Sequence, residues 1–593
     1  MHRRVLVRIA LSRPATDPMN LFRFLTILVT LIILPVAFGQ RQRGGGDNTN
    51  TVPPESEPGI PVTDKLTIDK CSSCHKADDK GNLTRISWIR TTPEGWEEAI
   101  KRMVRLNGLV ITPVEARHIL SYLSSDHGVA PEEIAERRWF LEMRQPETEP
   151  IPNAQIRMAC ASCHAFARPE TWFRSSTEWK LLENMHLGYF PVAENNSFHA
   201  RQRPEGVQML PVVSTPPGGP TKDPVDEALE YLDKNQGLHS AAWSNWRASL
   251  RDPDLKGRWA LSATSPGKGR YFGFLTVTQG SSPDAFTTEA TLTRVADGSK
   301  VTLKGQSVVY TGYEWRGRSK AEPIGTVREV MALSPDQSKM EGRWFWGDYQ
   351  EFGFNMQARR ESSDITVLGT DVTSIHAGSK DVPVKIFGEK FPRGVTPADI
   401  VLGAGVHVSK VVAATATELS VLVDVDTQIV SGFRSASVKT GLAPNAFAVY
   451  DKIDYIKVST DSALARLGGT THPKGYVQFE AVGYNRGLDG VANTADDINL
   501  GPIPVKWSME EFISRFNDDD KEFVGSLSAE GLFTPAGEGP NPQRRFMTNN
   551  TGDVWVVAKY KDAASGPTPL EAKGYLVVTV PVYMKWDEPE VAQ

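Results

Sequence analysis

Two short stretches of this chain each place two thiols and an imidazole within five positions. They are "CSSCHKA" at residues 71–77 and "CASCHAF" at residues 160–166. Between them they use all the cysteines of the chain, namely Cys71, Cys74, Cys160 and Cys163. In a C-x-x-C-H motif the two thiols can add to the two vinyl groups of one porphyrin, and the adjacent histidine falls beneath the iron. The motifs predict two covalent c-type haems, with His75 and His164 as proximal iron ligands.

Two other uses of paired thiols fit the sequence less well. A thioredoxin-like redox dithiol needs a βαβ surrounding, and its motif has no adjoining histidine. A zinc site needs further ligands at close spacing, and neither motif is followed by them. We therefore favour haem at both motifs over a redox dithiol or a zinc site.

The segments that follow the two motifs also resemble each other. Residues 112–128 read "TPVEARHILSYLSSDHG" and residues 223–237 read "DPVDEALEYLDKNQG". Each begins with a residue that caps helices and a proline suited to the first helical position, and each ends with Tyr-Leu-x4-Gly, where the glycine suits the helix C-terminus. The shared pattern indicates an internal duplication of a small helical haem domain.

The middle helix of each unit is expected to supply the sixth iron ligand. Aligning Trp96 with Trp179 places Met103 opposite His186, because each lies seven residues after its tryptophan. The alignment predicts His/Met ligation at the first haem and bis-His ligation at the second. A core methionine is the alternative interpretation of Met103, and the other candidates for the second haem are Met185 and His199. Because thioether ligation raises a haem potential, the Met-ligated haem is the expected terminal acceptor.

The N-terminus has the pattern of a secretory signal. An arginine precedes an apolar run from Phe24 to Leu34, and small residues follow. We expect a signal peptide at 1–39, with Met19 as an alternative start, and a disordered leader at 40–61. The apolar run is short for a membrane span, so no stable span is expected, although an uncleaved anchor is the alternative. The protein is then exported, and we expect it in the periplasm.

Beyond about residue 241 the hydrophobic pattern changes from helical periodicity to the alternation of strands. Glycine, proline and Asp-Gly pairs separate short apolar runs such as "GRYFGFLTVTQ" at 269–279. The sequence thus predicts a multidomain α plus all-β chain. In order, we expect a cytochrome c-like helical di-haem domain at 62–240 (repeats 62–145 and 146–240), an antiparallel β-barrel at 241–361, and immunoglobulin-like β-sandwiches at 362–457 and 458–593.

The β-rich part offers no recognisable catalytic constellation. It contains no G-x-S-x-G or H-E-x-x-H motif, and we expect no catalytic residue in this chain. Its aromatic residues are expected to form ordinary barrel core, with a ligand pocket as the alternative. The acidic loop "GLDGVANTADDINLG" could hold a cation through Asp489, Asp496 and Asp497, but its spacing is not that of a known calcium loop. The net charge of −5 gives no reason to expect nucleic acid as a partner.

The tandem haem motifs, the "VVYTGYEWRG" stretch at 308–317 and the order of domains together resemble the α subunit of quinohemoprotein amine dehydrogenase. The resemblance covers essentially the whole chain after the leader. It implies a heterotrimer with a β-propeller subunit and a very small subunit that carries a tryptophylquinone. It also implies that primary amines reduce the quinone, and that the two haems pass the electrons to an external copper protein or cytochrome c.

Three hypotheses for function follow from these observations. The first is an electron-transfer subunit of an amine dehydrogenase, and thus an oxidoreductase subunit. The second is a self-contained di-haem enzyme of the peroxidase type, which needs one iron with an open distal position. The third is a non-catalytic redox carrier whose β-domains bind a partner.

Overall fold

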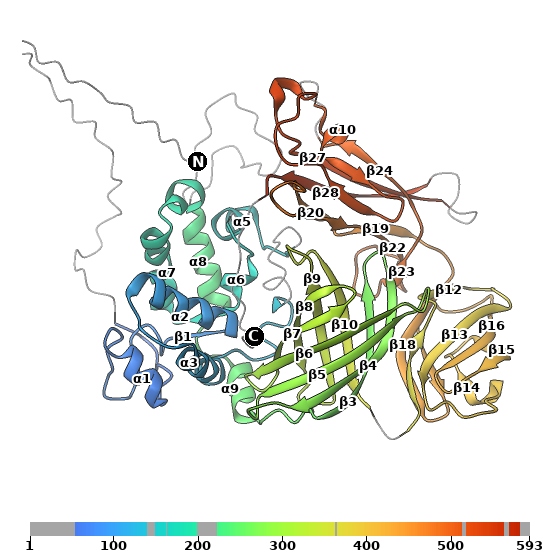
Figure 1. Ribbon diagram of the computed structural model, residues 1–593, viewed down its shortest axis with the longest axis horizontal. Helices are drawn as coiled ribbons and strands as arrows, with labels where there is room; N and C mark the ends of the chain where they lie inside the picture. Colours follow the sequence, from blue (N-terminus) through green and yellow to red (C-terminus); the bar gives the residue numbers. More distant parts are fainter. Residues whose placement is uncertain are drawn as a thin grey trace, which may run out of the picture. The chain divides into compact units, whose positions relative to one another are not determined.

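A computed structural model of the chain describes residues 54–138, 149–161, 163–198, 222–361, 364–512, 518–561 and 569–581. These residues form a helical region, an eight-stranded closed barrel and two further groups of β-sheets (Figure 1). The multidomain α plus all-β architecture predicted from the sequence is confirmed. Residues 1–39, with the expected signal peptide, lie outside the described part.

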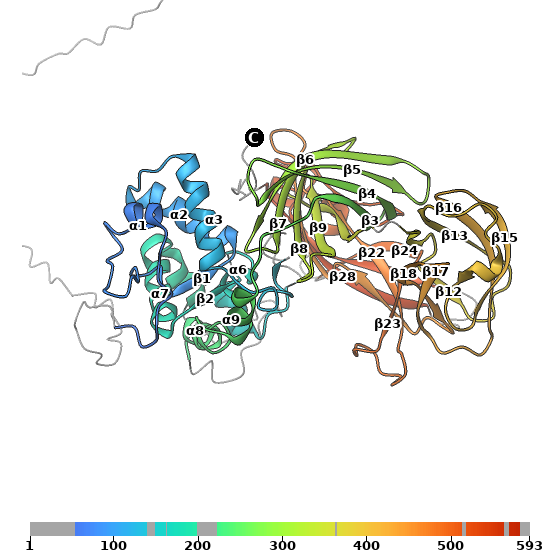
Figure 2. The ribbon, with the colours of Figure 1, turned by 90° about the horizontal axis from the view of Figure 1, so that it is seen from below.

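The helical region contains two short strands that pair with each other. Ile89–Thr91 (β1) runs antiparallel to Trp172–Arg174 (β2), and helices from both haem units surround the pair (Figure 2). The first unit contains α1 (Lys65–Cys71), α2 (Pro93–Asn107) and α3 (Pro113–Asp126). The second contains α5 (Ala154–Cys160), α6 (Ala167–Glu170), α7 (Ser176–Tyr189), a π-helical turn (Glu194–Phe198) and α8 (Pro224–Asn235), and α9 (Ala241–Ala248) follows.

The N-terminus of α3 follows the signal in the sequence. Thr112 caps α3 through a hydrogen bond from the Glu115 backbone N–H, and the Glu115 carboxylate accepts the Thr112 N–H in return. This reciprocal pair satisfies two backbone donors that a helix N-terminus leaves free. Proline occupies the first position of both α3 and α8, where its missing N–H costs nothing.

The two haem units share one packing arrangement around a tryptophan. Trp96 donates its indole N–H to the carbonyl of His127, and Trp179 donates to the carbonyl of Gln236, both at 2.9 Å. His127 and Gln236 are the C-cap residues of α3 and α8. Each of these carbonyls also accepts the backbone N–H of the last residue of β1 or β2, at 3.0 and 3.1 Å. This equivalence supports the internal duplication and the tryptophan alignment.

The residues that precede the first helix differ from expectation. The sequence placed residues 54–61 in a disordered leader, but they pack against the helical region. Ile60 is buried and its N–H donates to the Ser87 carbonyl at 2.7 Å, while the Trp88 indole donates to the carbonyl of Glu57 at 2.9 Å. The polar composition of this stretch hid the single buried isoleucine that anchors it.

The barrel closes on itself through eight antiparallel strands (Figure 1). They are β3 (Gly257–Ser265), β4 (Gly269–Gln279), β5 (Ala285–Arg294), β6 (Lys300–Tyr310), β7 (Glu314–Glu322), β8 (Gly325–Leu333), β9 (Lys339–Trp346) and β10 (Phe352–Arg360). Pairing of β10 with β3 closes the ring, so no strand edge is left open. Residues 241–256, which the sequence assigned to the barrel, instead contain helix α9.

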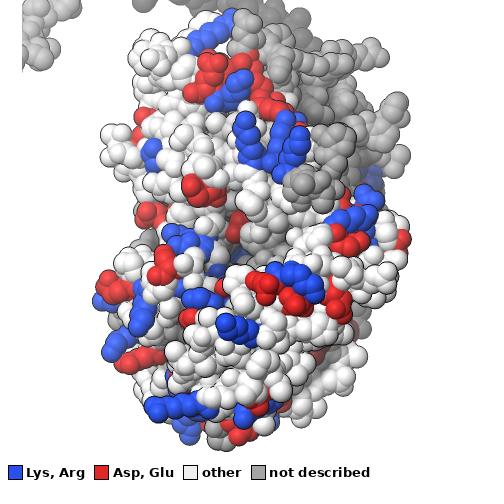
Figure 3. Space-filling view, turned by 90° about the vertical axis from the view of Figure 1, so that its right-hand side faces the viewer, with Lys and Arg blue, Asp and Glu red and all other residues white. Residues whose placement is uncertain are grey.

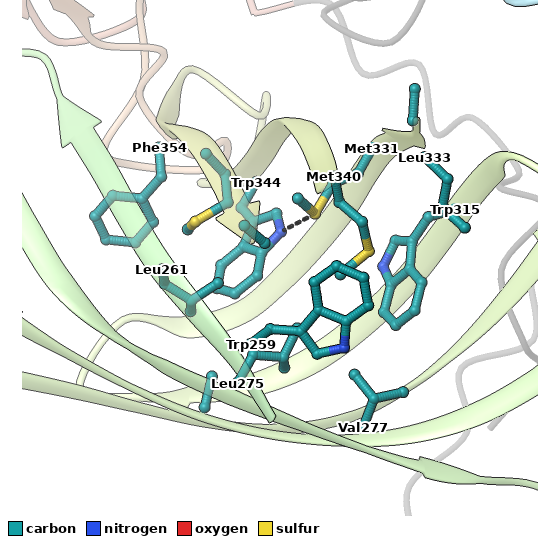
Figure 4. Close-up of a cluster of buried hydrophobic side chains, with 14 of the residues drawn as sticks. Trp259, Leu261, Leu275, Val277, Trp315, Met331, Leu333, Met340, Trp344 and Phe354 are labelled. Atoms are coloured by element: carbon teal, nitrogen blue, oxygen red, sulfur yellow. Dashed lines mark hydrogen bonds between the residues drawn. The ribbon is translucent and has the colours of Figure 1, made fainter. Parts of the chain in front are cut away.

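Side chains fill the barrel interior. Trp259, Trp315 and Trp344 point inward and are almost completely buried, and the Trp344 indole nitrogen lies 3.2 Å from the Met331 sulfur (Figure 4). At about 25 cal/mol per Å² and about 200 Å² per indole, burial of each contributes on the order of 5 kcal/mol. The barrel aromatics therefore form a packed core, as the sequence favoured.

Helix α9 and the loop between β6 and β7 join the helical region to the barrel. The Trp246 ring packs edge-on against Tyr313 with centroids 5.1 Å apart, and its indole donates to the Thr311 carbonyl at 3.2 Å. The Tyr313 hydroxyl, buried in the same place, donates to the carbonyl of Val129 in the helical region at 3.0 Å. The two regions thus share a hydrogen-bonded interface with a buried aromatic pair.

The third region is a sandwich of two four-stranded sheets. One sheet has the order β11 (Thr366–Thr370), β13 (Val382–Glu389), β16 (Glu418–Val425) and β15 (Val406–Ala414). The other has the order β12 (Ser374–His376), β18 (Gly441–Tyr450), β17 (Gly432–Val438) and β14 (Ile400–Val401), with a short 3₁₀ turn at Pro397–Asp399. Burial alternates along β16, as expected for a strand with one face in the core.

The C-terminal region has three sheets rather than the two of a simple sandwich. The first sheet has the order β19 (Tyr455–Ser459), β22 (Glu480–Asn485) and β23 (Ile498–Pro502). The second has the order β20 (Ser462–Arg466), β28 (Leu570–Thr579), β27 (Gly552–Tyr560) and β24 (Lys506–Glu511). The third has the order β21 (Val477–Gln478), β26 (Leu532–Pro535) and β25 (Gly525–Leu527). Helix α10 (Asp520–Phe523) and a 3₁₀ turn (Arg545–Met547) complete it.

The surface drawn in Figure 3 carries basic and acidic side chains intermixed, with no broad area of one sign. This distribution agrees with the small net charge of −5. On this face the protein offers no positive field of the kind that attracts nucleic acid.

Candidate haem sites

The first motif begins at the last residue of helix α1. The Asp64 carboxylate caps it by accepting the Thr67 N–H at 2.7 Å, and the helix ends at Cys71. The His75 backbone N–H then donates to the Cys71 carbonyl at 2.9 Å, which continues the turn through the motif. The C-x-x-C-H spacing therefore places both thiols and the imidazole on one short turn of backbone that continues from α1.

The imidazole of the first motif is held in one tautomer. His75 Nδ1 lies 2.8 Å from the Thr84 carbonyl oxygen. Because a carbonyl can only accept, Nδ1 carries the proton and the lone pair of Nε2 is free to bind iron. Burial, the largest cause, and the positive charge of Arg85 lower the pKa of His75, while the Thr84 carbonyl opposes them. The lower pKa favours the neutral form that a metal requires.

The second motif has the same construction. The Asn153 side chain caps α5 by accepting the N–H groups of Gln155 and Ile156, and the helix ends at Cys160. His164 Nδ1 lies 2.9 Å from the Ala165 carbonyl, which again leaves Nε2 free. Burial, aided by Arg168, lowers the pKa of His164 to about 4. This imidazole is therefore neutral at physiological pH.

The burial of two of the thiols does not favour a redox dithiol. All the cysteines are free, with Cys71 and Cys160 half-buried and Cys74 and Cys163 exposed. Burial raises the pKa of the Cys71 thiol to about 11 and that of Cys160 to about 12. Redox dithiols act through thiolates with lowered pKa values, so the raised values of Cys71 and Cys160 do not favour that chemistry.

His186 is the predicted sixth ligand of the second site. It is half-buried on α7, and its Nδ1 lies 2.9 Å from the Leu182 carbonyl one turn earlier, so Nε2 is again free. Its ring packs edge-on against Phe198, with centroids 5.5 Å apart. The charge of His186 contributes to lowering the pKa of His164, so the two imidazoles lie within electrostatic reach of each other. These contacts are compatible with bis-His ligation.

The other sixth-ligand candidates are placed as follows. Met185 is also half-buried, but it points about 100° away from His186 around the same helix, so one of the two can face His164. Met103 is half-buried on α2. Because a thioether is uncharged, it has no electrostatic effect on His75 that could indicate its position. The assignment of Met103 to the first haem therefore rests on the tryptophan arrangement that the two units share. His199 lies outside the described residues.

Sequence reasoning missed a group of arginines beside these sites. Arg85 directly follows the Thr84 that holds His75, and Arg102 directly precedes Met103 on α2. Arg168 lies on α6 and Arg174 ends β2, just before α7. The charges of Arg174 and Arg102 both lower the pKa of His186, after the larger effect of burial. Their spacing along the chain gives no pattern, so only the fold could show that they gather.

The acidic loop of the C-terminal region uses its carboxylates to hold its own turns. Asp496 accepts the backbone N–H groups of Leu488 and Asp489 at 2.7 and 3.1 Å. Asp497 accepts the N–H groups of Asn493 and Thr494 at 2.6 and 3.1 Å, and Asp489 accepts that of Val491 at 2.7 Å. These bonds explain the acidic residues of the loop without a cation.

Helices carrying two C-x-x-C-H sites, joined to a barrel and immunoglobulin-like sheets, define a multidomain haem-binding protein. Four family models agree: "Quinohemoprotein amine dehydrogenase A, alpha subunit, haem binding" matches residues 62–208, and quinohemoprotein amine dehydrogenase alpha subunit domains II, III and IV match residues 252–361, 361–451 and 456–591. The chain belongs to the family of quinohemoprotein amine dehydrogenase alpha subunits. It is therefore a haem-binding subunit of an oxidoreductase with further subunits.

Other comparisons add little. No curated protein matches the sequence. A redesigned beta barrel is 20% identical, with 18% of this chain and 92% of that chain covered and a TM-score of 0.16. The human mucin-like protocadherin EC1-2 is 11% identical, with 37% of this chain and 99% of that chain covered and a TM-score of 0.15. Within the described ranges no helix combines the length and apolar character that crossing a membrane requires.

Proposed function

We propose that this chain is the electron-transfer subunit of a periplasmic amine dehydrogenase. Electrons would pass from a quinone on a partner subunit, reduced by primary amines, through two c-type haems to an external copper protein or cytochrome c. The observation that carries the proposal is the repeated arrangement in which a C-x-x-C-H imidazole is fixed through Nδ1 and keeps Nε2 free.

The residues of the chain fit two covalent haems. At each site, addition of a thiol to a vinyl group forms a carbon–sulfur bond and transfers the thiol proton to carbon, with no net oxidation. Cys71 and Cys74 would fasten one group, with His75 and Met103 as iron ligands. At the second site Cys160 and Cys163 would do the same, with His164 and His186 as ligands. A haem iron held in this way accepts and releases one electron at a time.

The rest of the proposal concerns the partners and the location. We assign the barrel and the two groups of β-sheets a scaffolding role toward a β-propeller subunit and a small tryptophylquinone subunit. The predicted signal at 1–39 supports export to the periplasm. Covalent attachment suits that setting, because a fastened cofactor does not diffuse away from an exported protein.

The test is anaerobic reduction of the isolated native complex. Adding a primary amine should reduce the haems of this chain, seen as growth of the reduced α-band, and mass analysis of the separated chain should reveal two attached porphyrins. Buffer without amine and an added tertiary amine are the controls. A chain that carries no haem after export, or haems that an active complex leaves oxidised, would refute the proposal.

A further inference from the structure

Two arginines share one buried carboxylate between the haem units. Arg85 Nε lies 3.1 Å from Glu178 Oε2, and an Arg174 terminal nitrogen lies 3.9 Å from the same oxygen. Glu178 is 1% exposed and Arg174 6% exposed at the side chain. Arg85 belongs to the first unit, whereas Arg174 and Glu178 belong to the second. The two units therefore bring two guanidinium groups against a single negative charge.

A second pair of arginines lies around Glu98 on α2. The Arg168 guanidinium forms an ion pair with Glu98, and Arg102 follows Glu98 by one helical turn. Arg168 and Arg85 both act electrostatically on Arg102. All four guanidinium groups thus belong to one cluster, which we call the arginine cluster: Arg85, Arg102, Arg168 and Arg174.

Two members of the arginine cluster have guanidinium nitrogens without a hydrogen-bond partner. Three carboxylates act on the cluster, those of Glu98 and Glu178 and that of Glu55, which interacts electrostatically with Arg85. Among the described residues, the Arg102 guanidinium has neither a hydrogen bond nor an ion pair of its own, and only Glu98 and Tyr189 attract it electrostatically. The Nε of Arg174 is buried without a hydrogen-bond partner. Leaving a buried charged donor unpaired costs on the order of 1–3 kcal/mol or more.

An anion would remove this cost, and the position of the cluster indicates which one. Arg85 follows the residue that anchors His75, Arg102 precedes Met103, and Arg174 precedes the helix that carries His186. Arg85 and Arg102 are thus close in sequence to residues assigned to hold a haem, and Arg168 and Arg174 act electrostatically on His164 and His186. Each haem carries two propionate groups, and guanidinium groups bind carboxylates through paired hydrogen bonds.

We propose that the arginine cluster binds haem propionates, with Arg102 and Arg174 as the principal donors. This inference rests on the proposed function and adds the residues that orient both haems. The propionate edges of the two haems then meet the same cluster at the boundary between the units. The positive charge there also favours the reduced state of each iron, because reduction removes one positive charge from the haem.

The test compares Arg102→Gln with Arg117→Gln in the full chain carrying its haems. Arg117 is an exposed arginine on α3, so the second variant makes the same change in charge on another helix of the same unit. Spectroelectrochemical titration from pH 5 to 8 gives the midpoint potential of each haem, and haem content and circular dichroism verify loading and folding.

Arg102→Gln should retain both haems but shift one reduction equilibrium threefold to tenfold toward the oxidised form. A tenfold shift corresponds to about 59 mV for a one-electron couple. Without the Arg102 cation, the pKa of the propionate should also rise. The midpoint potential of that haem should therefore depend on pH between pH 5 and 8. Arg102→Lys should restore most of the wild-type profile.

Two results would overturn the inference while leaving the proposed function intact. One is an Arg102→Gln protein whose potentials and pH profile equal those of Arg117→Gln. The other is an equal change in Arg102→Lys and Arg102→Gln, which would indicate a packing effect. A wild-type chain without haem would instead refute the proposed function itself.

Discussion

Replacing Arg316 by methionine removes the cation that joins α2 to barrel strand β7. Arg316 Nε lies 2.5 Å from the Glu94 carboxylate near the start of α2, and a terminal nitrogen lies 3.3 Å from Glu314. The Arg316 and Glu314 side chains are 3% and 2% exposed. Methionine has a similar length but no charge, so the variant leaves two carboxylates without this partner. Breaking such a buried ion pair costs roughly 3–5 kcal/mol.

The cost should depend on pH because of Glu314. Burial raises the pKa of Glu314 to about 7, and the charge of Arg316 is the largest effect that opposes the rise. Without Arg316 this folded-state pKa climbs further, while the unfolded value is unchanged. Below pH 7 Glu314 is protonated in both folded proteins. Glu314 then no longer contributes to the difference in the free energy of unfolding between the variant and the wild type. Above pH 7 the variant should lose about 1.4 kcal/mol more for each unit by which the pKa has climbed.

The assay is thermal unfolding of the full chain by calorimetry at pH 6, 7 and 8.5. Lys304→Met is the matched control, because the ion pair of Lys304 with Glu289 on neighbouring strands is mostly exposed and contributes little. Arg316→Met should melt several degrees below the control at pH 7, and the gap should widen at pH 8.5. Melting within a degree of the control at every pH, or a gap that narrows above pH 7, would refute the reasoning.

Three further predictions follow from the haem sites. His186→Ala should change the spectrum of one oxidised haem and Met103→Ala that of the other, both with haem content retained; an unchanged spectrum in either variant would reject that ligand. Replacing both Cys160 and Cys163 by alanine should halve the covalently attached haem by mass, and a full complement would contradict covalent attachment there. Trp96→Phe and Trp179→Phe should each lower the free energy of unfolding, measured with denaturant, by about 1–2 kcal/mol. Each variant loses one buried hydrogen bond and some side-chain volume, while the carbonyl that accepted the bond keeps its backbone donor. Clearly unequal costs would contradict the equivalence of the two units.

The barrel shows which parts of the fold the sequence could predict. Alternating apolar residues and glycine turns predicted strands such as 269–279, and β4 spans those residues. Strand periodicity and turn residues act over a few positions, so one chain is enough to recognise them. The packed leader at 54–61 and helix α9 before the barrel were not predicted, because both depend on distant contacts: Ile60 with Ser87, and Trp246 with Thr311.

The haem sites likewise contain residues that the sequence could predict and residues that it could not. Two thiols and a histidine at C-x-x-C-H spacing are held together by the covalent chain, so the sequence alone was enough to propose the attachment residues and the proximal ligands. The proposed sixth ligands, Met103 and His186, lie on other helices, and the tryptophan alignment could suggest them only because the units are duplicated. The arginine cluster has no such repeat. Its members come from two loops or strand ends and two helices, and only the tertiary structure brings their like charges together, because long-range packing supplies the energy that opposes their repulsion.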